Sequence, residues 1–205
     1  MFERIRNKIT SPMQRCTRCF VRRQDGAAAV EFALIAVPFI GLFFAILETA
    51  LVFFAGQTLE NAASEAGRLV MTGQAQTTAY TPADPAKTGS GSVPFTADDF
   101  KGAVCDSLAG GLFDCANGVY VNVRTFSNFG SVDNSSPVTN GQLDTTKMNY
   151  APGGPGCIVT VTLYYQWPVY VTFLGDNLTN LNGGNRLLVA TSVFRNEPFG
   201  PAGTC

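Results

Sequence analysis

The chain has 205 residues, a formal net charge of −1 and no histidine. Histidine is the most frequent general base and metal ligand, so its absence argues against an enzyme and against a metal site. The charge is unevenly distributed, because residues 1–26 carry seven basic and two acidic side chains and the remainder has a net charge of −6. The acidic main part disfavours nucleic acid as a partner.

A long apolar segment follows the basic leader. Between Phe32 and Leu59 the only ionisable residue is Glu48. A helix needs about 20 mostly apolar residues to cross a bilayer, and residues 29–55 exceed that length. The stretch is longer than the roughly 7–15 residues of a secretory signal peptide, and no small-residue cleavage site follows it. We therefore expect a retained membrane helix.

The basic leader also predicts the orientation of this helix. Lys and Arg near a span stay on the cytoplasmic side, so residues 1–26 are expected inside and the C-terminal part in a periplasm-like space. Cys16 and Cys19 lie in the leader, where thiols stay reduced. Zinc needs four ligands, and no second ligand pair accompanies these two cysteines, so we expect a leader without metal or redox chemistry.

Four cysteines lie in the exported part, and an even number in an oxidising compartment favours disulfides. Four cysteines permit three connectivities. We favour Cys105 with Cys115, which closes a short loop, and Cys157 with Cys205, which ties down a terminal segment. The other two connectivities remain open at this stage.

The helix is expected to continue past the membrane as a stalk, so that residues 27–72 form one element. Apolar positions recur at i, i+3 and i+4 through residues 57–70, and Gly73 is a suitable helix stop. One face of this stalk consists of small residues at a spacing that permits close backbone approach. They are Ala62, Ala63, Ala66 and Gly67. This face can pack on the chain's own globular domain or on neighbouring subunits, and both alternatives remain open.

Residues 73–95 are rich in Thr, Ala, Pro, Gly and Ser and predict a linker. Residues 96–205 predict a periplasmic domain. It begins with a short helix, since Thr96 is a good N-cap and two acids follow in the first turn. Strands are predicted at residues 119–126, 157–165 and 187–195.

The predicted fold class is α+β. A long N-terminal helix precedes a small, disulfide-stapled domain with a three- or four-stranded antiparallel sheet and one short helix. Aromatic residues at 126, 129, 164, 165 and 167 are expected in its core, with an adhesion surface as the alternative. Glycine pairs lack a following lysine, and the acids lack metal-ligand spacing. We expect no catalytic residue, metal or cofactor.

Two segments carry a resemblance to a known family. Residues 26–38 (GAAAVEFALIAVP) and residues 62–74 (AASEAGRLVMTGQ) resemble the TadE-like pilus assembly family. Its members resemble pseudopilins or minor pilins of the tight-adherence (Flp) pilus, a type IVb-like system of bacteria. The resemblance implies processing by a prepilin peptidase, extraction from the inner membrane, and support of pilus assembly, adhesion and biofilm formation. Other Tad/Flp proteins and pilin subunits are the implied partners.

The resemblance also implies site residues. Gly26 would precede the scissile bond, and Ala27 would become the new N-terminus. Glu31 would then be expected to pair with a neighbouring subunit's N-terminal ammonium, with a carboxylate solvated at the headgroup boundary as the alternative. Glu48 lies about 260° round the helix from Glu31, and we expect it to hydrogen-bond a neighbouring helix or to act locally beside Thr49.

A second interpretation of the whole chain is an uncleaved anchor. In it the leader is retained, the helix stays in the inner membrane, and the periplasmic domain is presented to the pilus secretion machinery.

Overall fold

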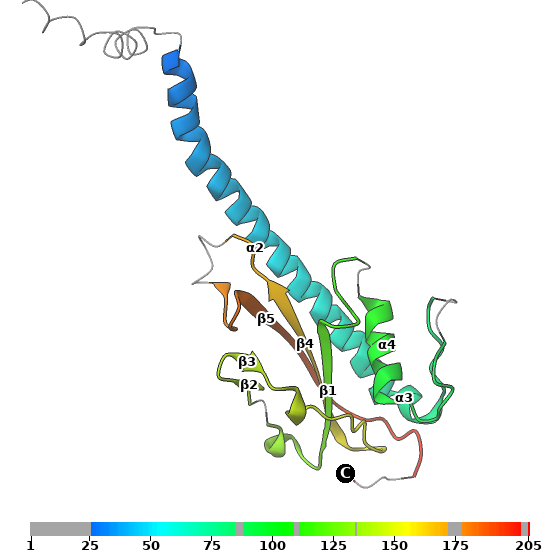
Figure 1. Ribbon diagram of the computed structural model, residues 1–205. Helices are drawn as coiled ribbons and strands as arrows, with labels where there is room; N and C mark the ends of the chain where they lie inside the picture. The colour runs from blue at the N-terminus through cyan, green and yellow to red at the C-terminus, as the bar shows by residue number, and fades with distance from the viewer. Residues whose placement is uncertain (1–25, 85–87, 109–110, 134, 172–177, 202–204) are drawn as a thin grey trace, which may run out of the picture. The chain divides into compact units, whose positions relative to one another are not determined.

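The computed structural model describes residues 26–84, 88–108, 111–133, 135–171, 178–201 and 205 (Figure 1). The leader cysteines Cys16 and Cys19, and the leader itself, lie outside the described residues apart from Gly26. The chain divides into two units, Met1–Leu47 and Glu48–Cys205. Helix α2 (Ala27–Met71) is continuous across this division.

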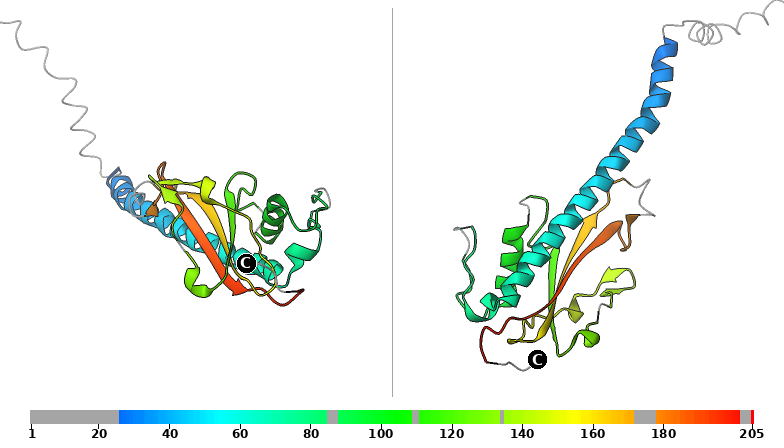
Figure 2. Two further views of the ribbon diagram at one scale, coloured as in Figure 1. Left: turned by 90° about the horizontal axis from the view of Figure 1, so that it is seen from below. Right: turned by 180° about the vertical axis from the view of Figure 1, so that it is seen from behind.

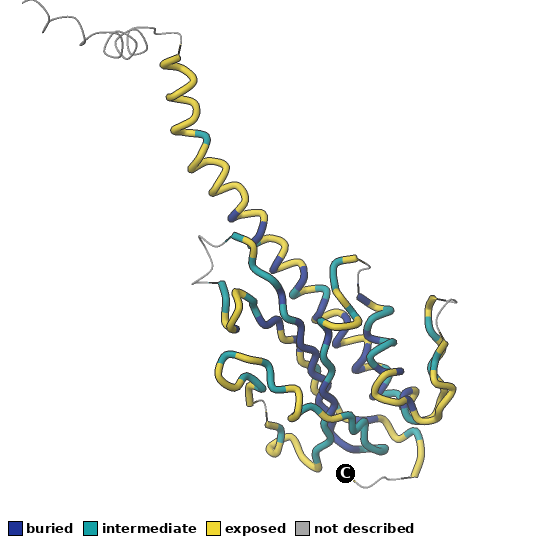
Figure 3. Tube along the Cα trace, viewed as in Figure 1, coloured by how far each residue is buried: buried dark blue, intermediate teal, exposed yellow. Residues whose placement is uncertain are grey.

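In the first unit the described residues from Ala27 onward belong to α2, and these residues are almost all exposed (Figure 3). By length and composition, α2 is the one helix of the described part that could cross a membrane. Pro38 lies inside it. Proline has no N–H, so one hydrogen bond of the helix is missing, an interruption that membrane helices tolerate.

The second unit is built on a three-stranded antiparallel sheet with the order β1-β4-β5. The strands are β1 (Val119–Phe126), β4 (Ile158–Pro168) and β5 (Asn185–Arg195). All three predicted strands are confirmed. β4 extends three residues beyond its predicted end and finishes at Pro168, the kind of terminal position that a proline tolerates in a sheet.

The sheet has helices on one face and short elements on the other (Figures 1 and 2). The helical face is covered by the C-terminal part of α2 and by α4 (Ala97–Ser107). The remaining elements are α3 (Gln74–Thr77), η2 (Phe129–Ser131), β2 (Val138–Thr139), β3 (Gln142–Leu143) and η3 (Thr145–Lys147). The α+β architecture predicted from the sequence is therefore confirmed.

The main core lies between the helices and the sheet. Alternate residues of a strand point to the same face, so Val159, Val161 and Leu163 all enter this core from β4. Val123 of β1 pairs with Val161 and adds to the same layer. From the helices come Leu59 and Val70 of α2 and Phe100 and Val104 of α4.

Only some of the aromatic residues expected in the core are buried there. Tyr164, Tyr165 and Trp167 are buried, as predicted. The rings of Tyr165 and Phe113 meet edge to face with centroids 4.8 Å apart. Phe129 is exposed on η2, so the prediction is wrong there, because η2 lies beyond the end of β1 and outside the packed layers.

Both disulfides follow the favoured pairing, Cys105 with Cys115 and Cys157 with Cys205. The first closes a separation of 10 residues and the second one of 48. In the chain-entropy description these loops correspond to about 3 and about 4 kcal/mol of stabilisation. The longer bridge fastens the terminal cysteine beside the start of β4.

Residues 73–95, expected as a linker, include ordered contacts with the domain. Gly73 follows α2 with φ of 79°, and a Cβ at this position would stand 2.3 Å from Cγ of Phe199. Glycine is therefore needed here both for the left-handed backbone and for space. Phe95 is buried, and its N–H donates to the carbonyl of Ala75 at 2.8 Å.

We predict that Gly73→Ala destabilises the full chain by about 1–3 kcal/mol, because it adds backbone strain and a clash. Gly56→Ala is the matched control: nothing lies within 4 Å of a Cβ there, and alanine is the better helix former by about 1 kcal/mol. Urea unfolding in detergent micelles, followed by near-ultraviolet circular dichroism, measures both. Equal urea midpoints for Gly73→Ala and Gly56→Ala would contradict the requirement for glycine at position 73.

Thr96 caps α4 as predicted. Its hydroxyl accepts from the Asp99 N–H at 3.1 Å, and the Asp99 carboxylate accepts from the Thr96 N–H at 3.0 Å. The same carboxylate accepts from the Ser90 N–H at 2.8 Å and from the Ser90 hydroxyl. Burial raises the pKa of Asp99, but the hydrogen bonds from Ser90 and Thr96 lower that pKa by more, so the net shift is downward.

A lowered pKa in the folded state means that the ionised form is stabilised by folding. The Asp99 contribution is therefore complete above the unfolded pKa of about 4 and declines as the pH falls toward the folded value. We predict that Asp99→Asn costs about 1–3 kcal/mol at pH 7 and less at pH 3. Asp98→Asn, at the exposed neighbouring position, should change stability little at either pH. If Asp99→Asn lowered the free energy of unfolding equally at pH 7 and pH 3, ionisation of Asp99 would not be coupled to folding.

Candidate processing and membrane-anchoring segment

The residues that the resemblance singles out first lie at the beginning of α2. Gly26 is exposed and directly precedes the helix, which begins at Ala27. No described atom comes within 4 Å of a Cβ built on Gly26. Packing among the described residues therefore gives no reason for a glycine at this position.

Glu31 is exposed in the first unit, four residues after Ala27. Residues four apart lie on the same side of a helix, about 6 Å apart along its axis. The carboxylate is thus close to the amino-terminal end of the helix, where the helix dipole favours negative charge. An additional cation at that end would strengthen this electrostatic preference.

The small-residue face of the stalk is buried within the second unit. Ala62, Ala63 and Ala66 are almost fully buried in the main core. A Cβ on Gly67 would come within 2.9 Å of Cε1 of Phe194 on β5. Of the two alternatives left open by the sequence, packing on the chain's own domain therefore describes these four residues.

Glu48 has a different partner from the one expected. It is 6% exposed, and its carboxylate accepts hydrogen bonds from the N–H groups of Tyr170 and, at 2.8 Å, Val171. These partners are available because the chain leaving β4 at Pro168 returns to α2 at this level, and the expected bond to a neighbouring helix stays a prediction. The sequence analysis missed Tyr170 and Val171 as partners, because they lie more than 120 residues from Glu48 and no local pattern indicates such a distant contact.

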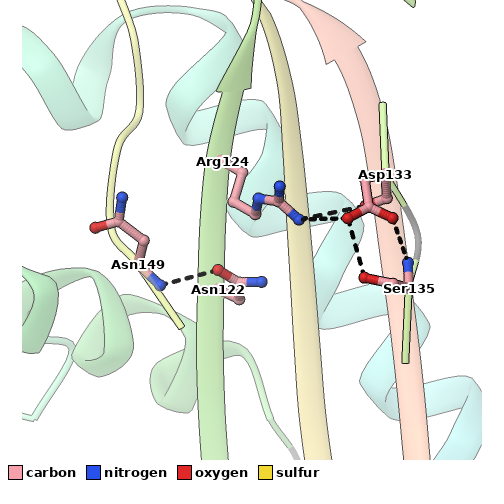
Figure 4. Close-up of polar contacts among 5 residues, drawn as sticks. All are labelled: Asn122, Arg124, Asp133, Ser135 and Asn149. Atoms are coloured by element: carbon pink, nitrogen blue, oxygen red, sulfur yellow. Dashed lines mark hydrogen bonds and ion pairs between the residues drawn. The ribbon is translucent and has the colours of Figure 1, made fainter. Parts of the chain in front are cut away.

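A polar hollow of about 300 Å³ lies on the other face of the sheet. Asp133 and residues 135–137 line it together with residues of strands β1, β4 and β5. Figure 4 shows Asp133 and Ser135 beside Arg124 of β1. Arg124 and Asp133 form an ion pair at 3.6 Å, and the Asn122 side chain accepts from the N–H of Asn149 at 3.0 Å. The Ser135 N–H and hydroxyl donate to the Asp133 carboxylate and hold its pKa below the usual range.

These polar groups largely satisfy one another. No cluster of three or more His, Cys, Asp or Glu residues that could hold a metal occurs in the part of the chain that the structure describes. The sequence predicted strand β1, but not which residues from other parts of the chain would lie beside Asn122 and Arg124. Among the described residues that line the hollow, no nucleophile is paired with a base.

Comparison with protein families gives one match. The family described as TadE-like protein matches residues 26–68, which begin at Gly26 and end within the stalk. The resemblance inferred from the sequence is therefore confirmed over this segment, and it supports a Tad pilus-associated protein. Comparison with curated proteins and with solved structures gave no match. The apolar helix in the matched segment is compatible with a single-pass membrane protein.

Proposed function

We propose that this chain is a pseudopilin or minor pilin of the tight-adherence (Flp) pilus, processed by a prepilin peptidase. The observation that supports the proposal most directly is that the family match and helix α2 begin at almost the same residue. The family match begins at Gly26, and α2 begins one residue later. Removal of residues 1–26 would leave a chain that starts with the helix itself.

The orientation follows from charge. The leader carries seven basic residues, which favours a cytoplasmic N-terminus and a periplasmic second unit. The two disulfides of the second unit suit an oxidising periplasm. The proposed activity is structural: the exposed apolar half of α2 anchors the subunit in the inner membrane and, after extraction, packs in the pilus to support assembly, adhesion and biofilm formation.

The role of Glu31 follows from the same cleavage. Hydrolysis after Gly26 creates an ammonium group at Ala27 of each subunit. In an apolar bundle of helices, that cation is the natural partner of a neighbouring subunit's Glu31. Removing one member of such a buried pair costs about 3–5 kcal/mol, since the other charge is left without compensation. Glu31 would thereby fix the axial register between subunits.

The cleavage is tested by the mass of the membrane-extracted protein from cells with an active prepilin peptidase. We predict a mature chain that begins at Ala27, and retention of the leader in Gly26→Ala. Gly41→Ala is the matched control, because Gly41 is also an open position with nothing within 4 Å of a Cβ. An intact Met1 terminus in the wild type would favour the uncleaved anchor instead.

If Glu31 fixes the register between subunits, then replacing it should impair assembly into the pilus without affecting cleavage of the leader. Glu31→Gln should be cleaved normally, yet its incorporation into sheared pili should fall by at least about a hundredfold, as expected for a loss of 3 kcal/mol or more. Glu65→Gln, an exposed stalk position, should assemble like the wild type. Quantitative immunoblotting of the sheared and membrane fractions measures both. Normal incorporation of Glu31→Gln into pili would show that pairing of Glu31 with the Ala27 ammonium is not needed for assembly.

A further inference from the structure

Two turns of α2 at the beginning of the second unit face two environments. On one side the helix is packed into the domain, since Val52 is 7% exposed and Ala55 is fully buried. The same turns also carry large apolar side chains that lie mostly outside this packed side. These are Leu51, Phe53 and Phe54, which are 50%, 72% and 56% exposed.

The exposed side changes character one turn later. After Phe54 the exposed positions of the helix are polar, beginning with Gln57 and Glu60. An apolar surface that ends at a polar one along a membrane helix marks the level at which lipid gives way to water. Because the helix rises 1.5 Å per residue, Glu48 lies about 10 Å on the apolar side of this change. Part of the second unit therefore lies at the same level.

The part in question is the chain that leaves β4. Tyr170 and Val171 are held against Glu48 by their backbone N–H groups, and the Tyr170 side chain is 77% exposed. Backbone N–H groups that enter a membrane without partners cost several kcal/mol each, and an uncompensated carboxylate is also costly. Here each satisfies the other, so this segment and the acid can enter an apolar environment together.

We propose that Leu51, Phe53, Phe54 and Tyr170 form an interfacial contact between the second unit and the bilayer, with Glu48 as its internal polar clamp. The partner is the lipid surface of the leaflet from which the domain emerges. Continuity with the apolar part of α2 and the aromatic composition, typical of membrane–water interfaces, favour lipid over other partners. This inference rests on the proposed membrane anchoring by α2.

Site-directed nitroxide labelling tests the contact in the full-length protein, reconstituted with one chain per lipid nanodisc. Single cysteines are introduced by Tyr170→Cys, Leu42→Cys and Phe129→Cys in a Cys16→Ser/Cys19→Ser background. Leu42 is an exposed position of the apolar helix. Phe129 is exposed beyond the opposite end of the sheet, since Phe126 pairs with Ile158 and Pro168 ends the same strand about 30 Å away.

The measured quantity is the ratio of collisions with oxygen, which concentrates in lipid, to collisions with a water-soluble nickel chelate. We expect the ratio at position 170 to be at least about threefold above that at position 129 and to approach that at position 42. Equal ratios at 170 and 129, with a high ratio at 42, would overturn this contact and leave membrane anchoring intact. A low ratio at 42 would overturn both the anchoring and the contact.

The clamp has its own test in the Tyr170→Cys protein. Glu48→Ala should release the segment after β4, raise the mobility of the nitroxide and lower the collision ratio at position 170 at least about twofold, because two backbone N–H groups lose their acceptor. Glu60→Ala, an acid on the exposed polar side, is the control and should change neither quantity. If Glu48→Ala leaves both unchanged, Glu48 does not hold the contact.

Discussion

The burial of small helix side chains against a valine-rich sheet is the constraint on which the second unit depends. Ala62 and Ala66 are almost fully buried in the core that α2 shares with the sheet, and Gly67 leaves space for Phe194 on β5. Close approach of this kind leaves few voids, so larger residues on the helix would separate the two layers. The same helix is therefore specialised along its length, with large apolar side chains toward Leu47 and small ones beyond Leu59.

That specialisation reconciles two requirements of the proposed pilus subunit. The exposed apolar half of α2 needs a surrounding of lipid or of other helices, whereas the stalk finds its partners within its own chain. The small-residue spacing, which in other settings brings separate helices together, is occupied here by the sheet. In the first unit, by contrast, Glu31 and the large apolar side chains remain exposed.

Local signals in the sequence predicted the elements well. The alternation of valines located β1 to the residue, and Thr96 with Asp99 gave the start of α4, because strand alternation and capping are both written in adjacent residues. Contacts between distant residues were not encoded in this way. The Glu48 carboxylate meets Tyr170 only because β4 is long enough to return the chain to α2, and no periodicity in either segment indicates it. The contribution of Asp133 and residues 135–137 to the polar hollow escaped prediction for the same reason.

The connection between α2 and β4 has a consequence for the order in which the chain folds. Leu59 and Val161 share one core but are about a hundred residues apart, and β5, which completes the sheet, follows later still. Contacts of such high sequence separation form slowly, because a long loop must close before they contribute. In the proposed periplasmic topology, the stalk would emerge with its alanine face uncovered until β5 has followed it across the membrane. A subunit of the proposed kind would then become competent for assembly only at the end of its translocation.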